Sequence, residues 1–251
     1  MPFCCAIFRF NRSRKGRSWG VVVHNCWQFL AAFLGASMQG GCISGANPQH
    51  NEEELAYQFN ETKCRVAFCS DFLFDKMKIV MQKCPNLKHL LLIPSQYPPI
   101  YQNSLPPNVH NWTDIIQNRP NIERKIPQIN IEKILLIYLF LGFLKNFENS
   151  FRNIFKRNYG SPKGVMLSHK NVGTILNIFN THFDERVCHR ISFNWDWKRE
   201  YTLLMLPLYH IYGFILGLNC LFTGSTGIMM KKFDLDLYCR TIQEYKVNNK
   251  F

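Results

Sequence analysis

The sequence has little negative charge, and no acidic residue precedes Glu52. It contains 17 Asp and Glu residues against 30 Lys and Arg residues, for a formal net charge of +13 at pH 7. This balance permits an anionic partner such as nucleic acid, a phosphate ligand or a membrane surface, without choosing among them. The basic residues are scattered and form no recognised nucleic-acid-binding motif, so a nucleic-acid-binding protein is the least favoured function class.

The sequence also lacks the features of a disulfide framework, a zinc ribbon or a clear membrane span. Its ten cysteines include no C-x-x-C pair, and a chain of this length needs no disulfides, so we expect reduced thiols. The apolar run Ile134–Leu144 is shorter than the ~20 residues that cross a bilayer. Leu203–Met230 has no charged residue, but Pro207, His210 and four glycines favour buried strand–turn–helix packing over a spanning helix. Membrane association is therefore disfavoured.

Apolar runs alternate with amphipathic segments along most of the chain. Helices are expected over Trp27–Gln39 and Tyr209–Phe222 and after the caps Asn51, Asp71, Ser168 and Asp234, with strands over Cys42–Asn47, Cys64–Cys69, Leu87–Ile93, Gly164–Leu167, Leu203–Leu206 and Gly227–Met230. Strands alternating with helices predict an α/β protein with a mostly parallel sheet and flanking helices.

Composition divides the chain into four segments. Residues 1–20 are predicted to be an irregular basic start; an organellar presequence is the alternative, although no amphipathic repeat is present. Residues 21–127 and 159–251 carry the α/β pattern. Residues 128–158 are anomalous, because 23 of the 29 residues from 130 onward are Ile, Leu, Phe, Asn, Lys or Tyr. Since these types come largely from A/T-rich codons, a mis-spliced insert is one interpretation, and an apolar helix over 134–147 is the other.

The string Tyr159–Asn171, Y-G-S-P-K-G-V-M-L-S-H-K-N, combines a glycine-flanked turn and a lysine with a following strand and capped helix. Glycines let backbone N–H groups approach anionic oxygens, and a lysine neutralises phosphate charge. The pattern therefore indicates a phosphate-binding loop. The pentapeptide alone is more typical of a surface turn before a strand.

Other motifs accompany this string in a fixed order. G-G-C-I-S-G-A-N-P begins at Gly40, L-P-L-Y-H-I-Y-G spans Leu206–Gly213, and K-K-F-D spans Lys231–Asp234. Together they make the sequence resemble the adenylate-forming (AMP-dependent) superfamily of acyl-CoA synthetases, 4-coumarate–CoA ligases and beetle luciferases. The resemblance covers about Val21–Ile93 and Gly160–Lys250, and it implies an incomplete N-terminal domain of that fold.

The resemblance implies a two-step ligase reaction. A carboxylic acid attacks the α-phosphorus of ATP held with Mg²⁺, which gives an acyl-adenylate and pyrophosphate; the thiol of coenzyme A then takes the acyl group. No metal ligand is assigned. The residues that fall on family positions are Gly160, Ser161, Lys163 and Gly164 for nucleotide phosphates, His210, Tyr212 and Gly213 for the acyl substrate, and Lys232 for coenzyme A. Without the resemblance, His210 is more typical of a core histidine held by a hydrogen bond, and Lys232 beside Lys231 is more typical of a solvated pair.

The sequence departs from the family pattern at the phosphate loop. The family reads S-S-G-T-T before its G-x-P-K-G, whereas this chain has F-K-R-N-Y at Phe155–Tyr159. The hydroxyls and the first glycine are missing, and bulky side chains obstruct backbone approach to a ligand. The family's later adenine, ribose and C-terminal-domain motifs are also absent before Phe251. We therefore expect a fragment that is inactive as written; a non-catalytic carboxylate-binding or scaffold relative is the alternative, and the lineage implies a cytoplasmic or peroxisomal location.

Overall fold

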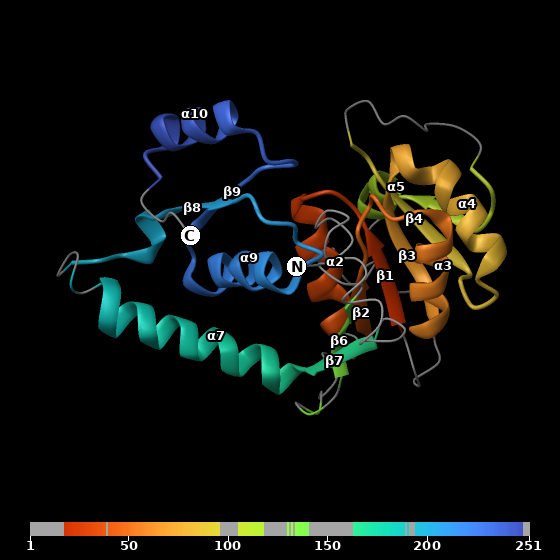
Figure 1. Cartoon of the computed structure of the whole chain (residues 1–251), viewed down its shortest axis with the longest axis horizontal. Coiled ribbons are helices and arrows are strands. Elements are labelled where there is room, and N and C mark those ends of the chain that lie inside the picture. The colour runs from red at the N-terminus through yellow and green to blue at the C-terminus, as the bar shows by residue number, and fades with distance from the viewer. Residues whose placement is uncertain are drawn as a thin grey trace, which may run out of the picture.

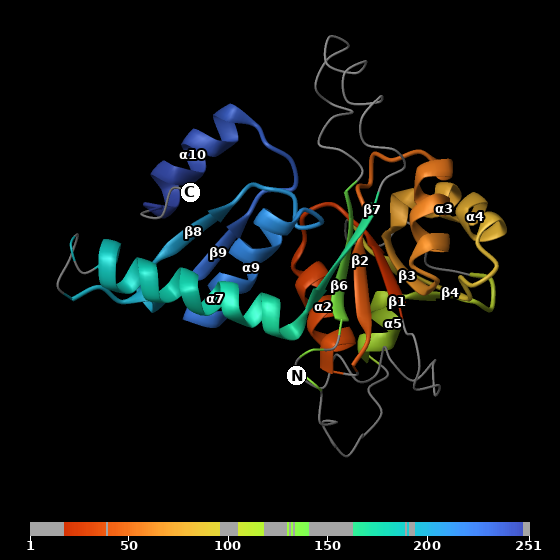
Figure 2. The same ribbon diagram turned by 60° about the horizontal axis from the view of Figure 1, so that its bottom comes forward.

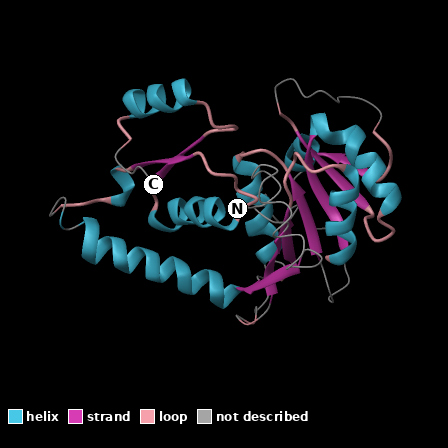
Figure 3. Ribbon diagram, in the orientation of Figure 1, coloured by secondary structure: helices cyan, strands magenta, loops and turns pink. Residues whose placement is uncertain are grey.

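The chain folds into two lobes that lie side by side (Figure 1). One lobe is built on a seven-stranded sheet and the other on a two-stranded sheet. Strands and helices alternate through both lobes, as the coloring by secondary structure shows (Figure 3), and the predicted α/β class is confirmed. The computed structural model describes residues 18–38, 40–95, 105–117, 130, 132, 134–140, 163–188, 190 and 194–247.

The large sheet has the strand order β5-β4-β3-β1-β2-β6-β7. Its first six strands are parallel, and β7 runs antiparallel to β6, so the mostly parallel sheet is confirmed. The strands are β1 (Ser18–Val22), β2 (Cys42–Gly45), β3 (Cys64–Ser70), β4 (His89–Ile93), β5 (Val109–Asn111), β6 (Ile134–Phe140) and β7 (Lys163–Ser168).

Helices cover both faces of this sheet, because alternate residues of the central strands point to opposite sides. Trp19 and Val21 of β1 pack in one cluster with α2 (Trp27–Met38), α5 (Trp112–Gln117) and α9 (Ile211–Thr223). Val22 packs on the other face with α3 (Glu52–Glu61) and α4 (Phe74–Lys83). Figure 2 shows α3 and α4 together on one side of the strands.

The small lobe places two parallel strands, β8 (Tyr201–Leu204) and β9 (Thr226–Met229), between helices. Helices α7 (His169–Phe183) and α9 cover one face, and α10 (Leu235–Tyr245) covers the other (Figure 1). The uncharged run Leu203–Met230 is thus divided among β8, α9 and β9, as expected. None of the helices in the described ranges combines the length and apolarity that crossing a bilayer requires.

Short-range caps begin several helices where the sequence predicts them. Asn51 and Ser168 each form a reciprocal capping box with the residue three positions later, and Asp234 accepts from the backbone N–H of Leu237 at 2.8 Å. The cap predicted at Asp71 is wrong. Its Oδ1 accepts from the N–H of Phe72 at 2.9 Å and of Ser95 at 3.1 Å, so it holds the ends of β3 and β4 together instead.

Two further elements differ from the sequence expectations. The central strand β1 begins at Ser18, inside the stretch expected to be irregular, because S-W-G-V-V is fully buried between β2 and β3. The alternative helix over 134–147 is wrong for 134–140, which form β6. This strand is rich in Ile and Leu and pairs with both β2 and β7.

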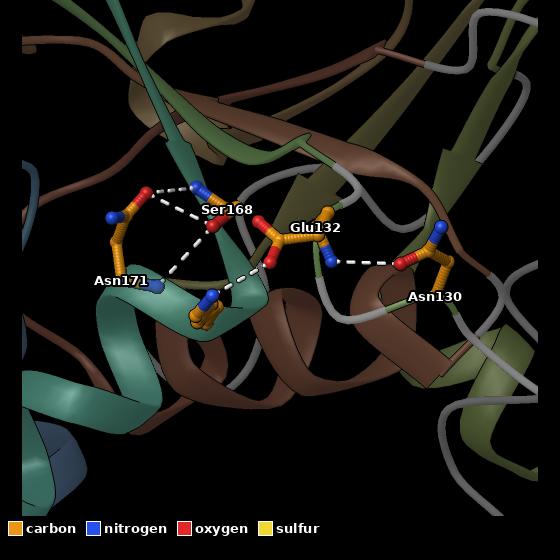
Figure 4. Close-up of polar contacts among 5 residues, drawn as sticks. Asn130, Glu132, Ser168 and Asn171 are labelled. Carbon is orange, nitrogen blue, oxygen red and sulfur yellow. Dashed lines mark hydrogen bonds and ion pairs between the residues drawn. The ribbon is translucent and has the colours of Figure 1, made fainter.

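The residues just before β6 also contact the start of α7 (Figure 4). Glu132 Oε1 pairs with Lys170 Nζ at 2.9 Å, and Asn130 Oδ1 accepts from the N–H of Glu132 at 2.9 Å. Beside them, Ser168 and Asn171 form the capping box of α7. This part of the anomalous segment therefore has defined contacts with the rest of the fold.

Candidate functional site

The parallel strands of the large sheet all end at one edge, where ligands bind in open α/β sheets. At this edge, the residues that follow β1 and β2 lie next to the loops that follow β8 and β9 of the small lobe. These four segments enclose a cavity of about 400 Å³, within the range of small-molecule sites. Its lining residues are His24, Asn25, Asn47, Pro48, Gln49, Met205, Leu206, Pro207, Tyr209, Lys231, Lys232 and Phe233.

Asn25 connects the two lobes at this cavity. Its Nδ2 donates to the carbonyl of Leu206 at 2.9 Å and of Met230 at 3.1 Å, and its Oδ1 accepts from the N–H of Leu208 at 2.8 Å. One buried amide thus satisfies three backbone groups from the loops after β8 and β9. Sequence reasoning missed this residue; the only available signal is a polar side chain directly after a buried strand.

Basic groups dominate the charged lining of the cavity. His24, Lys231 and Lys232 line it, and among the described residues no Asp or Glu belongs to the lining. Burial lowers the pKa of His24, and the positive charge of Lys231 lowers it further. Lys231 Nζ donates to the carbonyl of Ser95, beyond the end of β4, at 3.1 Å. The structure therefore places Lys232, the predicted coenzyme A residue, in a positive cavity.

The predicted acyl-substrate residues lie at the start of α9. His210 is the N-cap residue of this helix, and its Nδ1 accepts from the N–H of Tyr212 at 3.3 Å. Both side chains are exposed and lie outside the set that lines the cavity, to which their neighbour Tyr209 belongs. Gly213 is buried, so the structure brings the three residues to one helix turn and not into one pocket wall.

Gly213 allows α9 to approach the loop after β8. A Cβ atom at this position would lie 2.4 Å from the carbonyl oxygen of Pro207 and 2.8 Å from that of Leu206. Only a residue without a side chain permits this contact. The role visible in the structure is therefore close packing, which fixes the start of α9 beside the cavity.

The predicted phosphate loop is described only at its end. Gly160 and Ser161 lie outside the described residues, as does the side chain of Lys163. Gly164 lies on β7, paired with Leu139 of β6. Because β6 is parallel to β2 and Phe140 pairs with Lys163, the chain leaves and re-enters the sheet at the edge that bears the cavity.

The comparison with protein families matches most of the chain. The family model described as AMP-binding enzyme covers residues 11–127 and 159–249. The residues left between these two stretches, 128–158, are those with the anomalous composition.

Curated proteins and solved structures are similar over nearly the whole chain. Acyl-CoA synthetase 7 of Caenorhabditis elegans is 29% identical over 94% of this chain and 39% of its own length. The long-chain-fatty-acid–CoA ligase of Bacillus subtilis is 26% identical over 91% of this chain and 40% of its own length. A red-emitting luciferase from Phrixothrix hirtus superposes with a TM-score of 0.73 at 19% identity, covering 98% of this chain and 42% of its own. A structure described as a putative long-chain-fatty-acid CoA ligase from Rhodopseudomonas palustris gives 0.72 at 17% identity, with 98% and 52% covered. The chain thus spans about two fifths of the length of these curated relatives.

Proposed function

Because the chain belongs to the family of AMP-binding enzymes, we propose that it is part of an AMP-forming acid–thiol ligase of the acyl- or aryl-CoA synthetase type. Such a ligase joins a carboxylate to AMP with release of pyrophosphate and then transfers the acyl group to coenzyme A. The observation that carries the proposal is the positive cavity at the carboxyl edge of the sheet, which holds Lys232 and adjoins the start of α9.

The acyl substrate would be held at the start of α9. Backbone N–H groups at a helix N-terminus favour a carboxylate, and this helix is 13 residues long. The side chains of His210 and Tyr212 are exposed there. Gly213 keeps this turn against the Leu206–Pro207 backbone, and Lys232 would contact a phosphate of coenzyme A as a point charge.

The donor set at the phosphate loop does not fit a magnesium-bound triphosphate. Gly160, Ser161, Lys163 and Gly164 are present, but the five residues before them, Phe155–Tyr159, include no Ser, Thr or Gly. A loop without these hydroxyls and that glycine offers few ligands to phosphate and metal. We therefore propose that the chain as written binds a carboxylic acid and coenzyme A but does not complete adenylation.

An exchange assay tests the catalytic part of this proposal. Purified chain is incubated with ATP, Mg²⁺, labelled pyrophosphate and a panel of aryl, medium-chain and long-chain acids. We expect no exchange above background, and equilibrium dialysis should show saturable binding of at least one acid and of coenzyme A. Exchange above background would contradict the loop argument, and absence of both binding signals would contradict the assignment of the ligand surfaces.

Transcript sequencing tests the proposal that residues 128–158 contain a mis-spliced insert. The reads should cover the codons from Gln128 to Lys163. The unmatched stretch in the family comparison and the biased composition both support an insert. We expect the dominant transcript to replace part of this stretch with a loop rich in Ser, Thr and Gly. Reads that reproduce the present sequence would refute the insert.

A further inference from the structure

His24 lines the cavity, and one of its two ring nitrogens has no partner among the described residues. This nitrogen, Nδ1, is buried. The ring rests against Phe72, with centroids 5.2 Å apart, which fixes its position at the end of β1. A buried polar atom without a partner is unfavourable, so packing and not a hydrogen bond holds this side of the ring in place.

The surroundings of His24 favour an anion. Lys231 and Lys232 share the cavity with it, and Tyr209 is the other titratable group of the lining. Asp71, on the turn that carries Phe72, directs its Oδ1 to the N–H groups of Phe72 and Ser95. The cavity therefore concentrates positive charge next to a histidine that burial keeps neutral near pH 7.

We propose that His24, Lys231 and Lys232 together bind one phosphate group, and that His24 takes up a proton when the phosphate binds. The inference rests on the proposed function, because a phosphate of coenzyme A is the group that would reach Lys232. It adds two residues and a coupled proton to that contact. The proton comes from solvent: an N–H bond forms at the unprotonated ring nitrogen, an O–H bond of a hydronium ion or the bond to hydrogen of a buffer acid breaks, and no bond of the phosphate changes.

Binding of a proton to His24 and binding of an anion in the cavity affect each other. A bound dianion favours the charged form of a neighbouring histidine, so the pKa of His24 must rise on binding. By reciprocity, protonation of His24 must then strengthen anion binding, and affinity falls as the pH rises. Sulfate separates this effect from the titration of the ligand, because it stays a dianion throughout the neutral range, whereas a phosphate monoester titrates near pH 6.

Calorimetry on the full chain provides the test, with sulfate and adenosine 3′,5′-bisphosphate as probes. Titrations at pH 7 in buffers of different ionisation enthalpy report the protons taken up. We expect uptake of a fraction of one proton for sulfate, and an affinity that weakens about threefold or more between pH 6.5 and 8. Binding without proton uptake would overturn the role of His24.

Three variants assign the residues. His24→Gln should bind sulfate more weakly with no proton uptake and no pH dependence over this range. Lys232→Gln should weaken binding about fivefold to tenfold, the loss of one near charge. Lys88→Gln is the matched control, since Lys88 is exposed and precedes β4 at the opposite edge of the sheet. If Lys88→Gln loses as much sulfate affinity as Lys232→Gln, net charge alone explains the binding and the inference is overturned.

Nuclear magnetic resonance of the unaltered chain makes the test independent of variant folding. The ring nitrogens of His24 should shift toward the charged form when sulfate is added at pH 7. Carboxylate binding, measured in parallel, separates this inference from its premise. If an acid binds and neither anion does, the inference fails alone; if sulfate binds with proton uptake and no acid binds, the proposed ligase function fails while the His24 site stands.

Discussion

At the scale of single residues, Asn25 is the connection on which the cavity depends. Replacing Asn25 with Ala leaves the carbonyls of Leu206 and Met230 and the N–H of Leu208 without their partner. Each buried group left unpaired costs about 1–3 kcal/mol, partly relieved by water entering the cavity. We expect the free energy of unfolding to fall by about 3 kcal/mol, measured by urea denaturation.

A matched control separates this effect from the loss of any asparagine. Asn86 is exposed in the turn before β4, so Asn86→Ala should change the free energy of unfolding by less than about 0.5 kcal/mol. Asn25→Ala should also weaken sulfate binding, because the loop that carries Lys231 and Lys232 loses its attachment at Met230. Equal stability of the two variants would show that the lobes are held together by other contacts.

At the scale of elements, two glycines in helices make opposite predictions. Gly213→Ala places a methyl group 2.4 Å from the carbonyl oxygen of Pro207, so α9 must move away from the loop, and we expect a loss of about 2 kcal/mol. Gly173, exposed in α7, has no atom within 4 Å of its added Cβ. Gly173→Ala should stabilise the chain by about 0.5–1 kcal/mol through helix propensity. Thermal unfolding of both variants measures the contrast, and a stabilising Gly213→Ala would contradict the close packing of α9.

Two neighbouring histidines on β4 and β5 make the free energy of unfolding depend on pH. His110 Nε2 lies 3.3 Å from His89 Nδ1, and burial lowers the pKa of both rings, with further lowering by Arg65 for His89 and by His89 for His110. The pKa of both histidines is lower in the folded chain than the ordinary value of 6.5, which applies to the unfolded chain. At a pH between these values, the unfolded chain therefore binds more protons than the folded chain. The free energy of unfolding should fall as the pH is lowered through 6.5.

A variant isolates this contribution from that of His24, whose pKa is lowered as well. His110→Asn removes one titrating ring and relieves the other, so the slope of stability against pH between 7 and 5 should become shallower. Urea denaturation at each half unit of pH provides the measurement. An unchanged slope would assign the acid sensitivity of the chain to other groups.

Helix caps that depend on neighbouring residues could be predicted from the sequence, and contacts that depend on distant partners could not. Asn51 and Ser168 cap helices by reaching three residues ahead, so their pattern is visible in a short window. Asp71 also precedes a helical segment in the sequence, but its side chain accepts a hydrogen bond from Ser95, which follows the neighbouring strand β4. β1 was missed for a related reason: its short S-W-G-V-V run becomes a central strand only through β2 and β3.

At the scale of the whole molecule, the motifs identified the family, and the cavity depends on residues that the motifs do not include. The loop that leads to His210 and the loop that carries Lys232 both line the cavity, whereas the roles assigned to these two residues stay predictions. His24 and Asn25 were not predicted, because their importance comes from the loops after β8 and β9 at about 180 residues' distance or more in sequence. The role of a side chain that acts through such long-range contacts can be recognised only once the fold is known.

The described structure leaves apolar surface uncovered along β7 and α7. Val165 and Met166 are 45% and 61% exposed, and since neighbouring strand residues point to opposite faces, both faces of β7 are open. β7 is also the last strand of the sheet order, so its outer edge is unpaired within the part of the chain that the structure describes. An exposed apolar edge strand pairs readily with another chain.

We therefore expect the chain to self-associate, with an average mass by light scattering that rises with protein concentration. Met166→Lys puts a charge on this edge and should reduce the association, because a lysine opposes edge-to-edge pairing. Thr174→Lys adds the same charge at an exposed polar position of α7 and serves as the control. If Thr174→Lys reduces association as much as Met166→Lys, net charge and not the edge of β7 controls it; if only Met166→Lys does, the contact begins at this strand.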